Sequence, residues 1–100
     1  MSVNDIICQA IKESIVIQFT YDGHNRIVEP FTLGIRNGTS TLILSAYLIG
    51  GYSQSNSSPP WRSYDVYKIQ NISLTNKKSE SYRQGYNPND SRMSSIICTR

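Results

Sequence analysis

The chain has little of the chemistry on which enzymes depend, since it contains one histidine, two cysteines and only 17% charged residues. Catalysis needs a positioned acid, base or nucleophile, and the sequence has no paired-carboxylate, Ser-His-Asp or phosphate-loop signature. His24, at a turn and without a spaced cysteine or aspartate partner, is a weak candidate base. Together with Cys8 and Cys98 it supplies too few ligands for a zinc site. We therefore expect a protein that is not an enzyme and that uses neither a metal nor a cofactor.

Long apolar runs are missing as well. No segment approaches the roughly 18 residues of a membrane helix. The N-terminal stretch "MSVNDIICQAIKES" lacks the positive flank and the apolar centre of a signal peptide. These absences predict a cytoplasmic protein. Because thiols in that compartment are kept reduced, we expect Cys8 and Cys98 to be free.

Composition and charge indicate one folded domain with a basic half. A chain of 100 residues can build a single hydrophobic core, and its 38% hydrophobic residues and seven tyrosines favour a β-rich domain. Residues 1–50 carry three basic and four acidic side chains, whereas residues 51–100 carry seven basic and three acidic ones. This asymmetry indicates an anionic partner, although a solvated surface explains the charge equally well.

The N-terminal segment has a helical pattern that changes near Ser14. Ser2 and Asp5 have the spacing of a capping box, and the apolar residues that follow lie on one helical face. They predict a helix over residues 3–13. From Ser14 the apolar residues alternate with a period of two, which predicts a half-buried strand up to Tyr21.

Turn residues divide the rest of the chain into further short strands. Asp22-Gly23 and Asn37-Gly38 predict tight turns before the second and third strands. Pro30 has no N–H for a ladder, so the second strand lies at an edge or bends there. Residues 50–60 predict a surface loop, and residues 61–75 predict two more strands with a turn or bulge near Gln70-Asn71. One helix and about five short strands indicate a small, strongly bent antiparallel sheet or barrel.

Four segments resemble, in order and spacing, the WYL domain, a bacterial regulatory module with an Sm-like, SH3-type β-barrel. The segments are "IVIQFTYDG…RIVEPFTLG", "LILSAYLIGG", "WRSYDVYKIQNISLT" and "YRQGYNPNDSRM". The resemblance implies one domain, with the helix at residues 3–13, a five-stranded antiparallel barrel at 14–75 and a C-terminal tail at 76–100. Family members usually add a DNA-binding winged helix-turn-helix. Since one short helix precedes the barrel here, we expect a standalone WYL-like domain rather than a sequence-specific transcription factor.

The resemblance also accounts for the segment around Glu29. The family has a Tyr-x-Gly turn, an arginine and a Glu/Asp-Pro pair, which match Tyr21, Gly23, Arg26 and Glu29-Pro30. Glu29 has the parity of the neighbouring apolar residues, so we expect it to point inward or at a rim and to be paired there, for instance with an arginine. Arg26 is either that partner or a ligand contact.

The sequence departs from the family pattern in two segments, the second of which concerns the family's anion pocket. The triplet that names the family falls on Leu42, Ile43 and Leu44, so only a core role remains for these positions. The family's aromatic-Arg-Leu-Asp-Arg-Ile strand falls on residues 64–69, where Asp65 replaces a basic residue and Lys68 replaces an arginine. Lysine lacks the bidentate fork of arginine, so the pocket is weakened or rebuilt from neighbouring residues.

Tyrosines interleaved with basic residues suit stacking on bases beside neutralised phosphates. The resemblance likewise implies a ligand-sensing regulatory module for nucleic acid or a nucleotide. We expect the ligand, a single-stranded nucleic acid or a nucleotide, to bind a rim of six residues: Arg26, Tyr47, Trp61, Arg62, Tyr64 and Lys68. For each tyrosine, a role in core packing is the competing interpretation. The alternative function is a protein-interaction or oligomerisation module that uses the aromatic rim or an edge strand, and we expect a homo-oligomer, with a dimer as the first choice.

Overall fold

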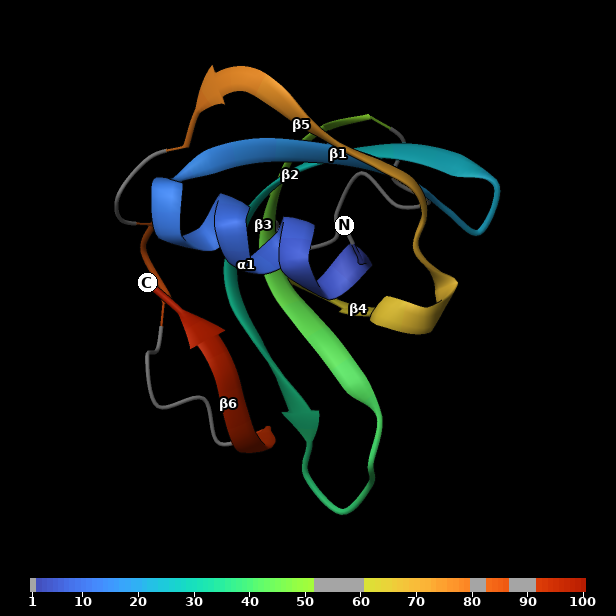
Figure 1. Cartoon of the computed structure of the whole chain (residues 1–100), viewed down its shortest axis with the longest axis vertical. Helices are drawn as coiled ribbons and strands as arrows, with labels where there is room; N and C mark the ends of the chain where they lie inside the picture. Colours follow the sequence, from blue (N-terminus) through green and yellow to red (C-terminus); the bar gives the residue numbers. More distant parts are fainter. Residues whose placement is uncertain (1, 52–60, 80–82, 87–91) are drawn as a thin grey trace.

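The computed structural model describes residues 2–51, 61–79, 83–86 and 92–100. They form one helix and a set of antiparallel strands (Figure 1). In chain order the elements are α1 (Val3–Glu13), β1 (Ile15–Tyr21), β2 (His24–Arg36), β3 (Leu42–Gly51), β4 (Trp61–Asp65), the 3-10 turn η1 (Val66–Lys68), β5 (Gln70–Lys78) and β6 (Met93–Thr99). The mainly β fold with an N-terminal helix, predicted from the periodicity, is confirmed.

Helix α1 has the predicted bounds and the predicted cap. The Ser2 hydroxyl accepts a hydrogen bond from the Asp5 N–H (3.2 Å), and the Ser2 N–H donates to the Asp5 carboxylate (3.4 Å). This capping box satisfies donors that the first helical turn leaves without a partner. Ser14 ends the helix in a left-handed conformation, with φ of 55°. The residue at which the sequence period changes is therefore the residue at which the chain leaves the helix.

Strand β2 is the centre of the sheet. The strands follow the order β4-β3-β2-β1-β5, and β6 also pairs with β2. One side of β2 pairs with β3, while the other side pairs first with β1, over residues 24–28, and then with β6, over residues 32–36. Pro30 lies at this change of partner, next to a register shift against β3. The strand is therefore not at an edge, and Figure 1 shows it curving from one part of the sheet to the other.

The predicted five-stranded closed barrel is not confirmed. The sheet has six strands, because residues 93–99 of the predicted C-terminal tail form β6. Within the described residues no backbone ladder joins β4 to β5, so the sheet stays open. The turn η1 connects these two strands in the chain, and contacts that involve side chains join β4 to β1. The Asp65 N–H of β4 donates to the Tyr21 hydroxyl of β1 (3.0 Å), and the Tyr64 and Phe19 rings lie 5.1 Å apart.

The main core lies between α1 and the concave face of the sheet, which we call the core face. Helix α1 contacts β1, β2, β5 and β6. The buried core residues are Ile7, Ala10, Ile11, Ile17, Phe19, Val28, Leu33, Leu44, Ala46, Tyr64, Val66 and Ile69. Since strand residues alternate between the two faces, their neighbours in sequence project from the opposite face.

A disulfide joins Cys8 of α1 to Cys98 of β6. Their Cα atoms are 5.7 Å apart, although the residues are separated by 90 positions. The prediction of free thiols is therefore wrong. The prediction was based only on the reducing compartment that we expected for the protein. In the structure, β6 pairs with β2 and contacts α1, which places Cys98 next to the helix.

Candidate anion-binding site

Five of the six residues predicted to form one rim are divided between the two faces of the sheet, and the sixth, Lys68, lies in the turn η1. In β4, Arg62 and Tyr64 project from the core face, and Trp61 projects from the opposite face. Tyr47 pairs directly with Trp61, so it shares that opposite face. Arg26 pairs with the core residue Phe19 and therefore lies on the core face. The predicted rim is thus two separate clusters.

The first cluster lies at one end of the core face and consists of Tyr21, Arg26, Arg62 and Tyr64; we call it the tyrosine–arginine cluster. The Tyr21 and Tyr64 rings meet edge to face, with centroids 5.0 Å apart and planes at 81°. The Arg26 guanidinium lies 5.8 Å from the Tyr21 ring centroid and donates a hydrogen bond to the Tyr21 carbonyl oxygen (3.5 Å). Curvature of the sheet brings these residues of β1, β2 and β4 together.

Tyr64 is the most informative member of this cluster. Its side chain is 3% exposed, and its hydroxyl has no hydrogen-bond partner among the residues that the structure describes. Burial raises the pKa of the hydroxyl, while the positive charges of Arg26 and Arg62 act to lower it. The hydroxyl therefore keeps its proton at neutral pH. It is a buried donor beside two cations, which suits an incoming anionic oxygen.

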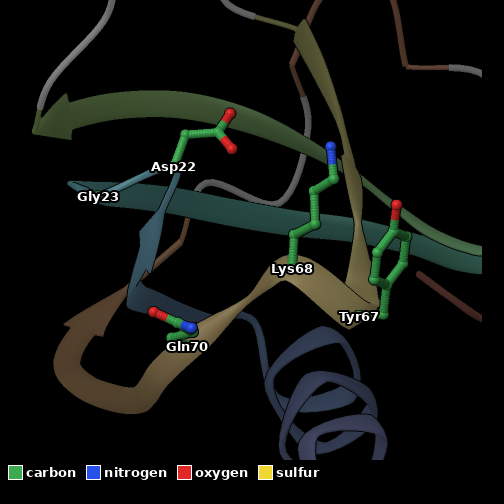
Figure 2. Close-up of a pocket in the computed structure, with 5 residues that line it drawn as sticks. All are labelled: Asp22, Gly23, Tyr67, Lys68 and Gln70. Carbon is green, nitrogen blue, oxygen red and sulfur yellow. The ribbon is translucent and has the colours of Figure 1, made fainter.

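A cleft of ≈ 400 Å³ lies next to this cluster, lined by Asp22, Gly23, Tyr67, Lys68 and Gln70. Figure 2 shows Asp22, Lys68 and Tyr67 projecting to the same side of the chain. The Lys68 ammonium lies 5.9 Å from the Tyr67 ring centroid, and the Tyr67 side chain is 75% exposed. An exposed ring beside a lysine suits stacking and charge neutralisation. Asp22 directly follows Tyr21 in the chain, although none of the four cluster residues lines the cleft itself.

Asp65 stands between the cleft and the cluster. Its carboxylate contacts Arg36 at 3.0 Å and Lys68 at 4.0 Å, and its N–H bonds to the Tyr21 hydroxyl. The acid that departs from the family pattern is therefore neutralised by two cations. Since side chains that are partly exposed form weak ion pairs, Lys68 is held only loosely by Asp65.

The second cluster lies on the opposite face and centres on Glu29. Its carboxylate, 2% exposed, receives two hydrogen bonds from Arg83: Nε at 2.7 Å and Nη2 at 3.0 Å. The expectation that Glu29 is buried and paired with an arginine is confirmed, and this bidentate pair is with Arg83, not with Arg26. The Arg83 guanidinium lies 4.5 Å from the Tyr47 ring centroid, and the Trp61 indole N–H donates to the Gln84 carbonyl (2.7 Å).

The sequence did not indicate that Tyr21 joins the tyrosine–arginine cluster, that Tyr67 lines the cleft or that Arg83 pairs with Glu29. Strict use of strand parity would have separated Trp61 from Arg62 and Tyr64. No comparable signal points to Arg83, which lies 54 residues from Glu29 and in no predicted strand. His24 is exposed, as expected for a turn.

Comparisons with protein-family models, with curated proteins and with solved structures found no match to this chain. The WYL resemblance therefore stays a hypothesis. No helix in the described part of the chain is long and apolar enough to cross a membrane. In those same residues, no three acidic, cysteine or histidine side chains gather where they could hold a metal ion.

Proposed function

We propose that this protein is a non-enzymatic binding module that takes an anionic ligand at the tyrosine–arginine cluster. The observation that carries the proposal is the buried Tyr64 hydroxyl, a donor that meets no acceptor among the described residues and lies in the field of Arg26 and Arg62. An unsatisfied buried polar group is costly, and an oxygen acceptor would remove that cost. Two neighbouring guanidinium groups favour an acceptor that is charged.

The adjoining cleft favours a nucleotide over a long single strand. Its volume of ≈ 400 Å³ is within the range of small-molecule sites. In the proposed complex a phosphate accepts from Tyr64 and pairs with Arg62 and Arg26, while a base stacks on the exposed ring of Tyr67. Lys68 adds a point charge at the cleft. Tyr47 and Trp61, which lie on the opposite face, take no part in this site.

The resemblance to the WYL family supports the same proposal. An N-terminal helix followed by the order β4-β3-β2-β1-β5 is compatible with an Sm-like arrangement, to which β6 is an addition. By analogy with that family, ligand binding would serve regulation.

The proposal is tested by titrating the protein with a nucleoside monophosphate, and separately with a short oligonucleotide, at two salt concentrations. Binding is followed by calorimetry and by amide chemical shifts, since Trp61 lies on the opposite face and is a poor reporter. Arg62→Ala should weaken binding about tenfold or more and reduce its dependence on salt. Lys77→Ala, on exposed β5, is the matched control and should change neither. Absence of binding, or equal affinities for the Arg62 and Lys77 variants, would reject the proposal.

The open edges of the sheet favour a second function, a protein-interaction or oligomerisation module. Strands β4 and β5 end the strand order, so each has an edge without a ladder in the described structure. Leu74 of β5 and Ile97 of β6 are exposed as well. An unpaired edge of this kind can add a strand from a second copy. Light scattering at rising concentration tests this function, and a dimer that persists in high salt, without nucleotide binding, would favour it over the first.

The cellular compartment is a separate proposal. The predicted cytoplasmic location conflicts with the disulfide between Cys8 and Cys98, because structural disulfides persist mainly in oxidising compartments. We therefore favour a protein that completes its folding under oxidising conditions. Neither proposed function depends on this choice.

A further inference from the structure

Glu29, Tyr47 and Trp61 form one row across three neighbouring strands. Glu29 of β2 pairs directly with Tyr47 of β3, and Tyr47 pairs directly with Trp61 of β4. Directly opposed residues project from the same face of an antiparallel sheet. Since all three residues sit in backbone ladders, the sheet itself holds the row in place.

The group that occupies this row is a guanidinium. Arg83 contacts both oxygens of Glu29 and lies over the ring of Tyr47. A two-point carboxylate contact combined with an aromatic face matches a planar guanidinium and does not match an ammonium ion. A second arginine packs on a neighbouring ring, with the Arg100 guanidinium 3.9 Å from the Phe31 ring centroid; Arg100 donates to the Pro30 carbonyl oxygen and interacts electrostatically with Glu29. The face is thus built for arginine side chains.

Arg83 lies in a segment that is not part of the sheet, unlike Glu29, Tyr47 and Trp61. Residues 83–86 form neither helix nor strand, and side-chain contacts attach them to the sheet. Trp61 donates to the Gln84 carbonyl and stacks on the ring of Tyr86, with centroids 6.4 Å apart. The Arg83 side chain is 30% exposed, while Glu29 beneath it is 2% exposed. A carboxylate that the sheet holds in place is therefore bound by an arginine from a segment that is not part of the sheet.

We propose that Glu29 and Tyr47, next to Trp61, form a guanidinium-binding site, which Arg83 fills from its own chain and which an arginine of a partner peptide occupies in its place. Arg83 then acts as an internal competitor. A tethered side chain acts at an effective concentration on the order of millimolar. A single free arginine therefore competes poorly with Arg83, and a partner needs further contacts beside the site. Removal of Arg83 opens the site to small probes.

The test uses the Arg83→Ala variant with its disulfide intact. N-acetyl-arginine amide is titrated against it, with Trp61 fluorescence and the thermal midpoint as readouts, and N-acetyl-lysine amide at the same ionic strength is the matched probe. We expect saturable binding that is at least tenfold tighter for the arginine derivative, together with a rise in the midpoint. The wild-type protein should bind the same probe at least tenfold more weakly.

Two further variants keep the test decisive. Arg83→Lys retains a charge opposite Glu29, so it serves if Arg83→Ala does not fold, and the arginine derivative should still displace its lysine. The double variant Glu29→Gln/Arg83→Ala removes both charges and should not bind the probe. The proposal is overturned if the folded variants show no saturable binding, if both derivatives bind equally, or if binding survives the loss of the Glu29 charge.

Discussion

Two buried polar side chains show how the surroundings decide what a residue does. Glu29 and Tyr64 are almost equally hidden from solvent, at 2% and 3% exposure. Glu29 has both oxygens bound by Arg83, whereas the Tyr64 hydroxyl has no acceptor among the described residues. The Glu29 carboxylate is thus bound by an arginine of the same chain, whereas the Tyr64 hydroxyl offers a donor to a ligand. We therefore expect substitutions at these two residues to have different effects on stability.

Replacement of Tyr64 by phenylalanine should change the pH dependence of stability. Burial raises the pKa of Tyr64 in the folded state above the ordinary value of about 10. Above that pH the unfolded state loses this proton first, so the contribution of Tyr64 to stability is present below about pH 10 and declines as pH rises through the folded pKa. Urea unfolding at pH 8 and pH 11 should show a smaller alkaline loss for Tyr64→Phe than for wild type. Parallel pH profiles would contradict the assignment.

The two partners of the Glu29–Arg83 pair should differ in the cost of their loss. Arg83→Ala leaves a buried carboxylate without its bidentate partner, which costs about 3 to 5 kcal/mol of unfolding free energy. Glu29→Gln leaves the charge on Arg83, which is 30% exposed and reaches water, so the cost is closer to the loss of one charged hydrogen bond, about 1.5 to 3 kcal/mol. Urea titrations of both variants measure the difference. Equal costs would show that Glu29 is better solvated than the structure indicates.

At the scale of single residues, the sequence predicted which way a side chain points but not which residue it contacts. The alternation around Glu29 indicated a buried, paired carboxylate, because a charge at an apolar position needs compensation. It did not identify Arg83, since contacts between distant residues follow from the path of the chain and not from local pattern. The same limit applies to Tyr64, which reaches Phe19 only because the sheet curves.

At the scale of elements, the periodicity of apolar residues was sufficient to predict a helix or strand wherever that segment has one buried face. The helix over residues 3–13 was predicted with its bounds, and the strand that follows it begins one residue later than predicted, at Ile15. Strand β6 was missed because most of its residues are exposed and its burial does not alternate. The bulge predicted near Gln70-Asn71 is present, since Asn71 has φ of 54° and β5 changes register against β1 there. The preceding turn at Val66–Lys68 was not predicted.

Gly34 of β2 lies where β6 leaves no space for a side chain, so its replacement should disturb β6. A Cβ atom at Gly34 would overlap the Ser95 carbonyl oxygen and lie 2.6 Å from the Met93 sulfur. We expect Gly34→Ala to lower the unfolding free energy by about 1 to 3 kcal/mol, as for other overpacked sites.

Gly50 provides the matched control for this substitution. It also lies in a strand, but a Cβ there would make an ordinary contact of 3.5 Å with Ile27. Gly50→Ala should therefore change stability by less than about 1 kcal/mol. Urea unfolding and hydrogen exchange of the β6 amides distinguish the two variants. Fully protected β6 amides in Gly34→Ala would show that the strands can separate without loss of pairing.

At the scale of the whole molecule, curvature and long-range pairing decide what the sequence pattern leaves open. The predicted site failed as one rim because its residues alternate between two faces, and the predicted barrel failed because six strands form an open sheet. The disulfide is also a feature that depends on long-range pairing. Cys8 and Cys98 are brought together by the helix and by the last strand, and neither element by itself indicates the contact.

The disulfide should supply a large part of the stability of the chain. It joins residues separated by 90 positions, so it restricts almost the whole unfolded chain, and the chain-entropy relation gives about 4 to 5 kcal/mol. A single domain of this size is stable by only about 5 to 15 kcal/mol, so reduction should lower the urea midpoint severely or unfold the protein.

The measurement compares wild type with and without reductant and adds the double variant Cys8→Ser/Cys98→Ser. We expect the double variant to match the reduced wild type and to be insensitive to reductant, because both lack the same covalent link between α1 and β6. Mass spectrometry after thiol labelling should find no reactive thiol in the oxidised wild type, before or after denaturation. Labelling of both cysteines in protein purified without reductant, or equal urea midpoints in its presence and absence, would show that the helix and β6 are held together by packing alone.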